Sequence, residues 1–208
     1  MNDAFAELVN EDTSQNKNCE WCAESHLGIG KKTSYGAIIV YRIGKEEDGW
    51  FATLSPKTGG DPAHDCTLQL MSTKHLTHFC QLGANEKRAA NYGIAFAKLS
   101  AALTQLMAME SPQFQVTSAN KEDAVSVATY GKATNWKEKK EHLHVKLFPF
   151  RNAIGQPYTV DSTFEKKHIH KDKDGEFVKM QPVKKVLIDK ERLELLAKKL
   201  MKCMSETE

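Results

Sequence analysis

The stretch from Glu141 to Pro149 carries reactive side chains at every second position: His142, His144 and Lys146. The positions between them are apolar, and this period of two predicts a β-strand. Its apolar face would pack on a core and its polar face would point to a cleft or to water. Two imidazoles and one ammonium, about 6–7 Å apart along a strand, favour a site for phosphate, for a metal ion or for both. Pro149 should end the pairing of this strand.

Cys19 and Cys22 form a CxxC pair, which is the second chemical feature of the chain. Half of a zinc site, a redox pair and two unrelated buried thiols all remain open for such a pair. A redox pair is expected after a strand, and no strand pattern precedes Cys19. The five cysteines are odd in number and follow no secretory signal, so we expect thiols and a metal site rather than a disulfide framework.

The composition of the 208 residues predicts one domain, with 40% hydrophobic and 27% charged residues. The net charge of +2 does not by itself indicate nucleic acid, and we expect no nucleic-acid partner. No run of 18 apolar residues predicts a membrane span. The N-terminus lacks a basic and an apolar signal region, so we expect a cytoplasmic protein with no membrane partner.

Local patterns predict an α+β fold in which an antiparallel sheet of about five strands supports the reactive side chains. Periodic apolar residues predict one long helix over 86–109 that packs on the sheet, and Ser111-Pro112 should stop it. A C-terminal helix is predicted over 189–203, with Asp189 at its start. Strands are predicted over residues 35–43, 50–54, 66–71, 114–118 and 141–149.

The run His-Leu-His-Val-Lys-Leu-Phe-Pro over 142–149 resembles the signature of the histidine-triad superfamily, His-φ-His-φ-His-φ-φ with a Pro soon after. The galactose-1-phosphate uridylyltransferase branch of that superfamily has Gln at the third place, where this chain has Lys146. Family members also carry a Gln four residues before the first triad histidine, where this chain has Glu138. Both departures bear on activity rather than on fold.

The resemblance implies a zinc site. Many relatives carry a CxxC pair near the N-terminus as half of such a site, and the uridylyltransferases use the first triad histidine as a ligand. Family members also have a histidine after the strand that precedes the long helix, and His75 occupies that place. His78 is three residues further on and is an alternative. The implied ligands of zinc are therefore Cys19, Cys22, His75 and His142.

The resemblance also implies chemistry on nucleotides. His144 occupies the place of the nucleophile that forms a nucleotidyl-histidine intermediate, which predicts a nucleotide-phosphate hydrolase or a nucleotidyltransferase. Lys146 and Arg151 would bind the phosphate or the nucleotide. The alternative is a nucleotide-binding domain of histidine-triad type with weak or no activity. A third hypothesis is a processor of nucleic-acid ends, which would need a basic face. Relatives often dimerise, so a homodimer is expected.

These expectations divide the chain into a flexible N-terminal segment over 1–18, a histidine-triad-like domain with the zinc site over 19–160, and a C-terminal extension over 161–208. The loop over 55–62 would border a nucleotide pocket or be a plain surface loop. The Lys-rich connection over 119–140 would contact phosphate or only water. In the extension we expect a charged loop over 164–174, an edge strand over 176–180, and a possible second metal site at His168 and His170.

Overall fold

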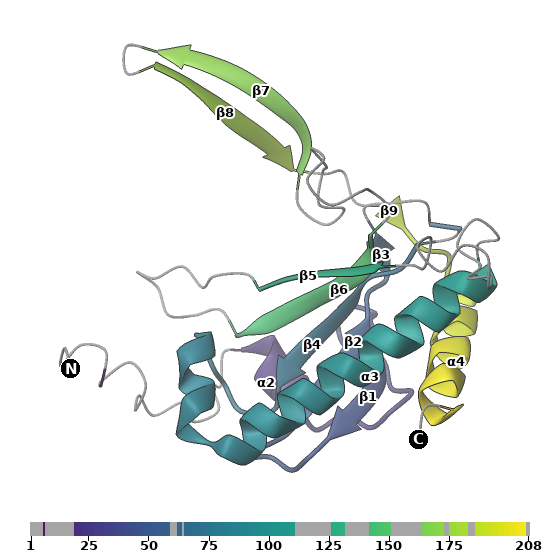
Figure 1. Ribbon diagram of the computed structural model, residues 1–208. Coiled ribbons are helices and arrows are strands. Elements are labelled where there is room, and N and C mark those ends of the chain that lie inside the picture. The colour runs from purple at the N-terminus through teal and green to yellow at the C-terminus, as the bar shows by residue number, and fades with distance from the viewer. Residues whose placement is uncertain are drawn as a thin grey trace, which may run out of the picture.

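The computed structural model describes residues 6, 19–58, 62–63, 65–110, 126–131, 142–150, 164–172, 175–182 and 186–206. A five-stranded antiparallel sheet forms its centre, and one long helix crosses a face of that sheet (Figure 1). The predicted α+β class is therefore confirmed. The strands lie in the order β1 (Ile38–Ile43), β2 (Trp50–Leu54), β4 (Leu68–Ser72), β6 (His144–Phe150) and β5 (Ser126–Gly131).

The two predicted helices are confirmed as α3 (Glu86–Glu110) and α4 (Lys190–Glu206). Asn85 caps α3, because its side-chain oxygen accepts a hydrogen bond from the backbone N–H of Arg88 at 3.0 Å. Asp189 caps α4 in the same way and accepts from the N–H of Glu191 at 2.9 Å. α4 packs on α3 and on the β1 side of the sheet (Figure 1).

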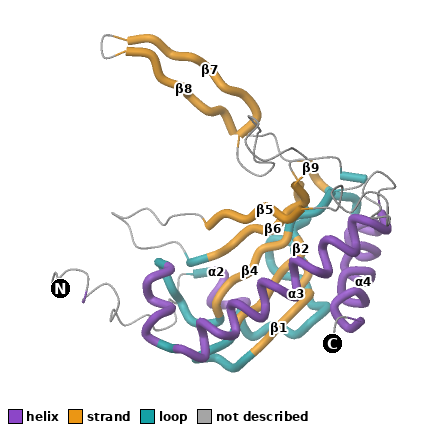
Figure 2. Tube along the Cα trace, viewed as in Figure 1, coloured by secondary structure: helices purple, strands orange, loops and turns teal. Residues whose placement is uncertain are grey.

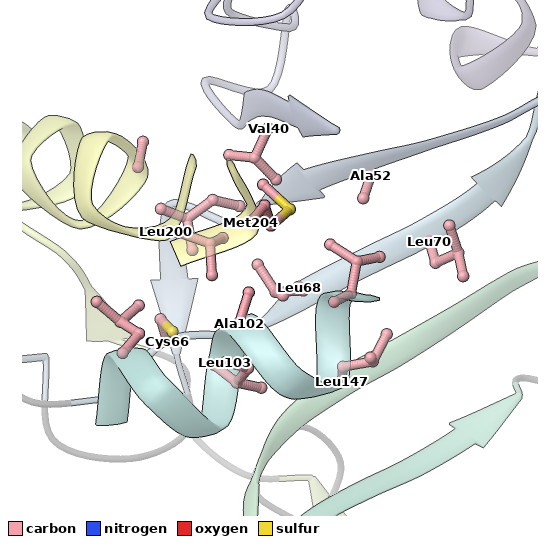
Figure 3. Close-up of a cluster of buried hydrophobic side chains, with 14 of the residues drawn as sticks. Val40, Ala52, Cys66, Leu68, Leu70, Ala102, Leu103, Leu147, Leu200 and Met204 are labelled. Carbon is pink, nitrogen blue, oxygen red and sulfur yellow. The ribbon is translucent and has the colours of Figure 1, made fainter. Parts of the chain in front are cut away.

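Side chains that alternate along each strand give the sheet two different faces. One face packs under α3 and α4 and forms the main apolar core (Figure 3). In that core Leu68, Leu70 and Leu147 from the sheet meet Leu103 of α3 and Leu200 of α4, all fully buried. The opposite face, which we call the site face, consists of Phe51, Thr53, Gln69, Met71, His144 and Lys146.

Smaller elements connect the sheet to the helices. α2 (Glu20–Glu24) contains the second cysteine of the CxxC pair, and η1 (Phe79–Ala84) is a 3-10 helix that precedes α3. β3 (Lys57–Thr58) pairs with β9 (Val186–Leu187). The predicted loop over 55–62 therefore contains a short strand, which joins the segment before α4 to the central part of the chain.

The central strand differs from its prediction at both ends. β6 begins at His144, so His142 precedes the strand rather than lying within it. The backbone N–H of Leu143 donates to the carbonyl of Leu76 at 2.6 Å, which ties this segment to the one after β4. Pro149 does not end the pairing, since it lies opposite Val127 of β5. Pairing with β4 stops at Leu147, so beyond that residue β6 has a described strand neighbour on one side alone. A proline is tolerated at such an edge position because no second ladder needs its N–H.

Two predictions for connecting segments were wrong. β5 lies within residues 119–140, which were predicted as a connection, because its pairing with β6 is a non-local contact that a local pattern does not show. The second error is the charged loop expected over 164–174, since most of it is the strand β7 (Phe164–Asp172). The strand predicted over 176–180 is present as β8 (Gly175–Pro182). β7 and β8 pair with each other in a separate two-stranded sheet (Figure 2). The strand predicted over 114–118 lies outside the described residues.

Candidate metal centre

Four buried side chains from three distant segments converge on one point. Cys19 and Cys22 come from the start of α2, His75 follows β4, and His142 immediately precedes β6. One ligand atom from each residue lies within 4.8 Å of every other. The structure thus brings together the four residues that the resemblance implied as ligands, and this cluster can hold a metal ion.

The separations within the cluster fit a tetrahedral ion. The Nδ1 atom of His142 lies 3.5 Å from the Sγ of Cys19 and 3.6 Å from the Sγ of Cys22. The Nδ1 atom of His75 lies 3.3 Å from the Sγ of Cys22. A tetrahedron with Zn–S bonds of about 2.3 Å and Zn–N bonds of about 2.05 Å has sulfur–nitrogen edges of about 3.6 Å. The donor set of two thiols and two imidazoles is also one that zinc prefers.

The ring of His142 is held in the tautomer that a metal ligand needs. Its Nε2 lies 2.8 Å from the carbonyl oxygen of Ser72, so Nε2 carries the proton and donates it. Nδ1 then presents its lone pair to the two sulfur atoms. The Ser72 hydroxyl lies 3.2 Å from the same Nε2 and donates to the carbonyl of Lys74 at 2.7 Å. This hydrogen bond at the far nitrogen is typical of a histidine that binds a metal.

Electrostatics favour the neutral form of the same ring. Burial first, and then the nearby imidazole of His75, lower the pKa of His142 to about 3. The hydrogen bond to Ser72 acts in the opposite direction and His144 lowers the pKa further, both to a smaller extent. A neutral imidazole can donate its lone pair to a metal over the whole physiological pH range.

His144 lies directly beyond this cluster on the site face. Its Nδ1 lies 3.0 Å from the carbonyl oxygen of His142, so Nδ1 carries the proton and Nε2 carries the lone pair. The indole of Trp21 stacks on the ring of His144, with centroids 6.2 Å apart and planes inclined by 26°. Trp21 lies between the two cysteines of the CxxC pair, so the metal cluster and His144 share a neighbour.

Lys146 follows on the same face and is 8% exposed, which is low for a lysine. It lies directly opposite Gln69 of β4, and Gln69 lies opposite Thr53 of β2. The side-chain oxygens of Gln69 and Thr53 are buried, and neither has a hydrogen-bond partner in the described part of the chain. A polar row therefore runs across β2, β4 and β6 beside His144.

Of the other predicted site residues, His78 alone has a side chain that the structure describes. His78 is outside the cluster, because its Nδ1 lies 2.8 Å from the Thr77 hydroxyl and its backbone begins η1. Arg151 and Glu138 lie outside the described residues. His168 and His170 belong to β7, and their side chains lie outside the described part of the structure.

The other cysteines do not extend the metal cluster. All five cysteines are free thiols in the structure. Burial raises the pKa of the Cys66 thiol to about 12, so this side chain is an unreactive part of the apolar core. Cys203 is likewise buried in that core, on α4.

Sequence reasoning missed three residues of the site: Trp21, Ser72 and Gln69. Trp21 carried a signal, since its place between Cys19 and Cys22 keeps its backbone close to both thiols in any fold that uses the pair. Gln69 lies between Leu68 and Leu70, so the sequence shows that its side chain is on the other face of the strand. The sequence does not show that Gln69 pairs with Lys146 of β6. The role of Ser72 depends on its backbone carbonyl, which no residue pattern reveals.

No family model, curated protein or solved structure matches this chain. Among the helices in the described part of the chain, none is long and apolar enough to cross a membrane.

Proposed function

We propose that this protein is a histidine-triad-like nucleotide-phosphate hydrolase or nucleotidyltransferase, with His144 as its covalent nucleophile. The hydrogen bond between Nδ1 of His144 and the carbonyl of His142, at 3.0 Å, carries the proposal. It leaves the lone pair on Nε2, the atom that would attack phosphorus. The pattern over residues 142–149 supports the same role, because His144 is its middle histidine.

The proposed reaction proceeds in two displacements. In the first, Nε2 of His144 forms a bond to the α-phosphorus of a nucleotide phosphoanhydride, and the bond to the leaving oxygen breaks with its electron pair. In the second, water or an acceptor hydroxyl attacks the phosphorus, releases its proton to solvent and displaces the imidazole. One difficult displacement is thereby divided into two easier ones.

Lys146 would stabilise the negative charge that develops on the phosphate oxygens. Lys146 is a buried residue and lies two residues from His144 on the same strand face. A charged lysine has no lone pair, so it cannot take up a proton from the attacking water and pass it on. This property favours the second candidate, a domain that binds nucleotides but turns them over slowly or not at all.

The metal in the proposal is zinc, held by Cys19, Cys22, His75 and His142. Four protein ligands close the tetrahedron, so the ion would be structural and would not bind the substrate. When bound, the ion would join three segments of the chain and contribute folding free energy. The residues of the chain then hold His144 in place for reaction.

The test is to trap the intermediate with nucleotides labelled at the α-phosphate. Dinucleoside polyphosphates, nucleotide sugars and nucleoside phosphoramidates form the panel, and the label on the protein is measured after a rapid quench. An acid-labile phosphoramidate that His144→Ala abolishes is the expected result, because removal of a nucleophile erases most of the rate enhancement. The matched control is His26→Ala, which changes a histidine outside the cluster.

Two other outcomes contradict the enzymatic proposal. A label that survives in His144→Ala would place the covalent chemistry elsewhere. Binding of a mononucleotide by calorimetry, with no label from any member of the panel, would favour the binding domain instead.

A further inference from the structure

The helix α2 connects the metal cluster to the proposed nucleophile through one side chain. Cys19 and Cys22 face the metal cluster, whereas Trp21 packs against the small apolar cluster of Ile39, Phe51 and Met71. The indole continues from this apolar contact onto the ring of His144. A single short helix therefore contacts both the metal ligands and the imidazole that would react.

α2 is too short to hold this position by itself. It has five residues, and no side chain caps its start at Cys19. Isolated helices of that length are not stable in water. Its anchors are the thiols of Cys19 and Cys22 in the cluster and the packing of Trp21, together with the Glu24 carboxylate, which accepts from the N–H of Ser34 at 2.5 Å.

Two of the contacts that hold His144 lead to the metal cluster. The carbonyl of His142 accepts from its Nδ1, and the ring of His142 is itself a candidate ligand. Trp21 covers a face of its ring at an inclination of 26°, within the range of offset stacking. The hydrogen bond fixes one ring nitrogen, and the indole stacked on the ring restricts its tilt about that bond.

The geometry points to Trp21 as a positioning residue through which occupancy of the metal site orients the imidazole of His144. With the metal bound, α2 is fixed and the indole holds the ring. Without the metal, α2 loses its two thiol anchors and the indole no longer restrains His144. The reactive role of His144 is taken from the proposed function, but its orientation can be measured without any turnover.

The orientation of His144 is measured by NMR on protein labelled with ¹⁵N-histidine, and His144→Ala identifies its signals among those of the eight histidines. Three metal-loaded proteins are compared: the natural chain, Trp21→Leu and Trp21→Phe. Leucine keeps an apolar contact with the site face but has no planar ring, whereas phenylalanine keeps the ring. Zinc content and thermal unfolding are measured on each to show that the cluster and the fold persist.

In the natural chain the Nδ1 proton of His144 should exchange slowly with solvent. Trp21→Leu should accelerate this exchange by about ten-fold or more, because local opening exposes the hydrogen bond to water. Trp21→Phe should restore slow exchange. If His144 of the natural chain becomes labelled by nucleotide, Trp21→Leu should also slow this labelling by about 10–100-fold, because the imidazole ring is misplaced.

Removal of zinc with a chelator tests the link to the metal. Trp21 emission should shift to longer wavelength as the indole enters water, and added zinc should reverse the shift. Trp21→Phe, which retains the chain's other two tryptophans, provides the reference spectrum. The Nδ1 proton of His144 should also exchange faster without zinc.

Equal exchange of the His144 proton in the natural chain and in Trp21→Leu would overturn the inference, whether or not any nucleotide labels the protein. Identical Trp21 emission with and without zinc would overturn the coupling to the metal. Absence of label in the natural chain, together with slow exchange that depends on Trp21, would refute the enzymatic proposal while the positioning role stands.

Discussion

His142 and His144 are two residues apart, yet their rings carry the proton on opposite nitrogens. Nε2 of His142 donates to the carbonyl of Ser72, and Nδ1 of His144 donates to the carbonyl of His142. Each carbonyl fixes one tautomer and thus decides which lone pair remains. One ring presents Nδ1 to two sulfur atoms, and the other keeps the lone pair on Nε2. Two identical side chains therefore suit different chemistry.

The charge of Lys146 is the next property to test at the scale of single residues. Lys146→Met keeps the length and the apolar stem but removes the ammonium. It should lower the rate at which nucleotide labels His144 by about 10²-fold, because a positive group close to the phosphate is lost. The measurement is single-turnover labelling, and Lys190→Met, at an exposed position that begins α4, is the control. An unchanged rate would separate Lys146 from the phosphate.

At the scale of elements, the end of α3 is joined to α4 through one carboxylate. Glu110 is 6% exposed and lies 2.5 Å from both Arg192 and Lys199. Burial raises the pKa of Glu110, but the hydrogen bonds and charges of Lys199 and Arg192 outweigh burial and bring it below its usual value. A negative charge at a helix C-terminus is unfavourable on its own, so these partners are required there.

Glu110→Gln should therefore destabilise the contact between the two helices. We expect a loss of about 1–2 kcal/mol in the free energy of unfolding at neutral pH, reduced from the value for a buried pair since Lys199 is 41% exposed. The folded pKa lies below the unfolded one, so the stabilisation is present above the usual carboxyl pKa of 4.5 and disappears as the pH falls through the folded value.

Urea unfolding at neutral and at acidic pH measures this difference between the natural chain and Glu110→Gln. The two should converge as the pH falls below 4.5, the ordinary pKa of the group. Glu194→Gln is the matched control, because its ion pair with Lys32 is exposed on both sides and should matter little. A difference that persists unchanged at acidic pH would assign the effect to shape rather than to charge.

At the scale of the whole molecule, the metal cluster joins α2, the segment after β4 and the start of β6. The apolar cluster on this side of the sheet is small: Ile39, Phe51 and Met71 are its buried members in the described chain, and Trp21 packs against it. The main core lies on the other face. A bound ion would thus stabilise the part of the molecule that has least hydrophobic packing.

Cys19→Ser should remove the metal and destabilise the fold. Structural zinc contributes folding free energy directly, and a loss of about 3 kcal/mol would lower the Tm by roughly 6–12 °C in a chain of this size. Elemental analysis of protein purified without added zinc and calorimetric unfolding measure both effects. Cys80→Ser changes a half-buried cysteine outside the cluster and should alter neither. Zinc retained at one equivalent in Cys19→Ser would contradict the assignment.

The homodimer that the resemblance implies also belongs to this scale. Sedimentation velocity over a range of concentrations measures it. A single monomeric species throughout that range would contradict the expectation.

Local periodicity in the sequence determined the elements whose patterns are complete within one segment. The 3.6-residue pattern of α3 and α4, the start of α4 at Asp189, and the two-residue alternation of β6 all depend on neighbours along the chain. The identities of the four metal-cluster residues were available as well, although the resemblance and not their spacing selected His75 and His142. The α+β class followed from these local signals.

Tertiary structure alone decided which segments meet. β5 pairs with β6, and β7 pairs with β8. The residue pattern of a strand does not show which other strand it will pair with. The contact of Trp21 with His144 and the tautomers of the two histidines depend on carbonyls and rings that only the folded chain brings within hydrogen-bond distance. Periodicity specifies which way a side chain faces, but what it faces is set by strand order and packing across the whole molecule.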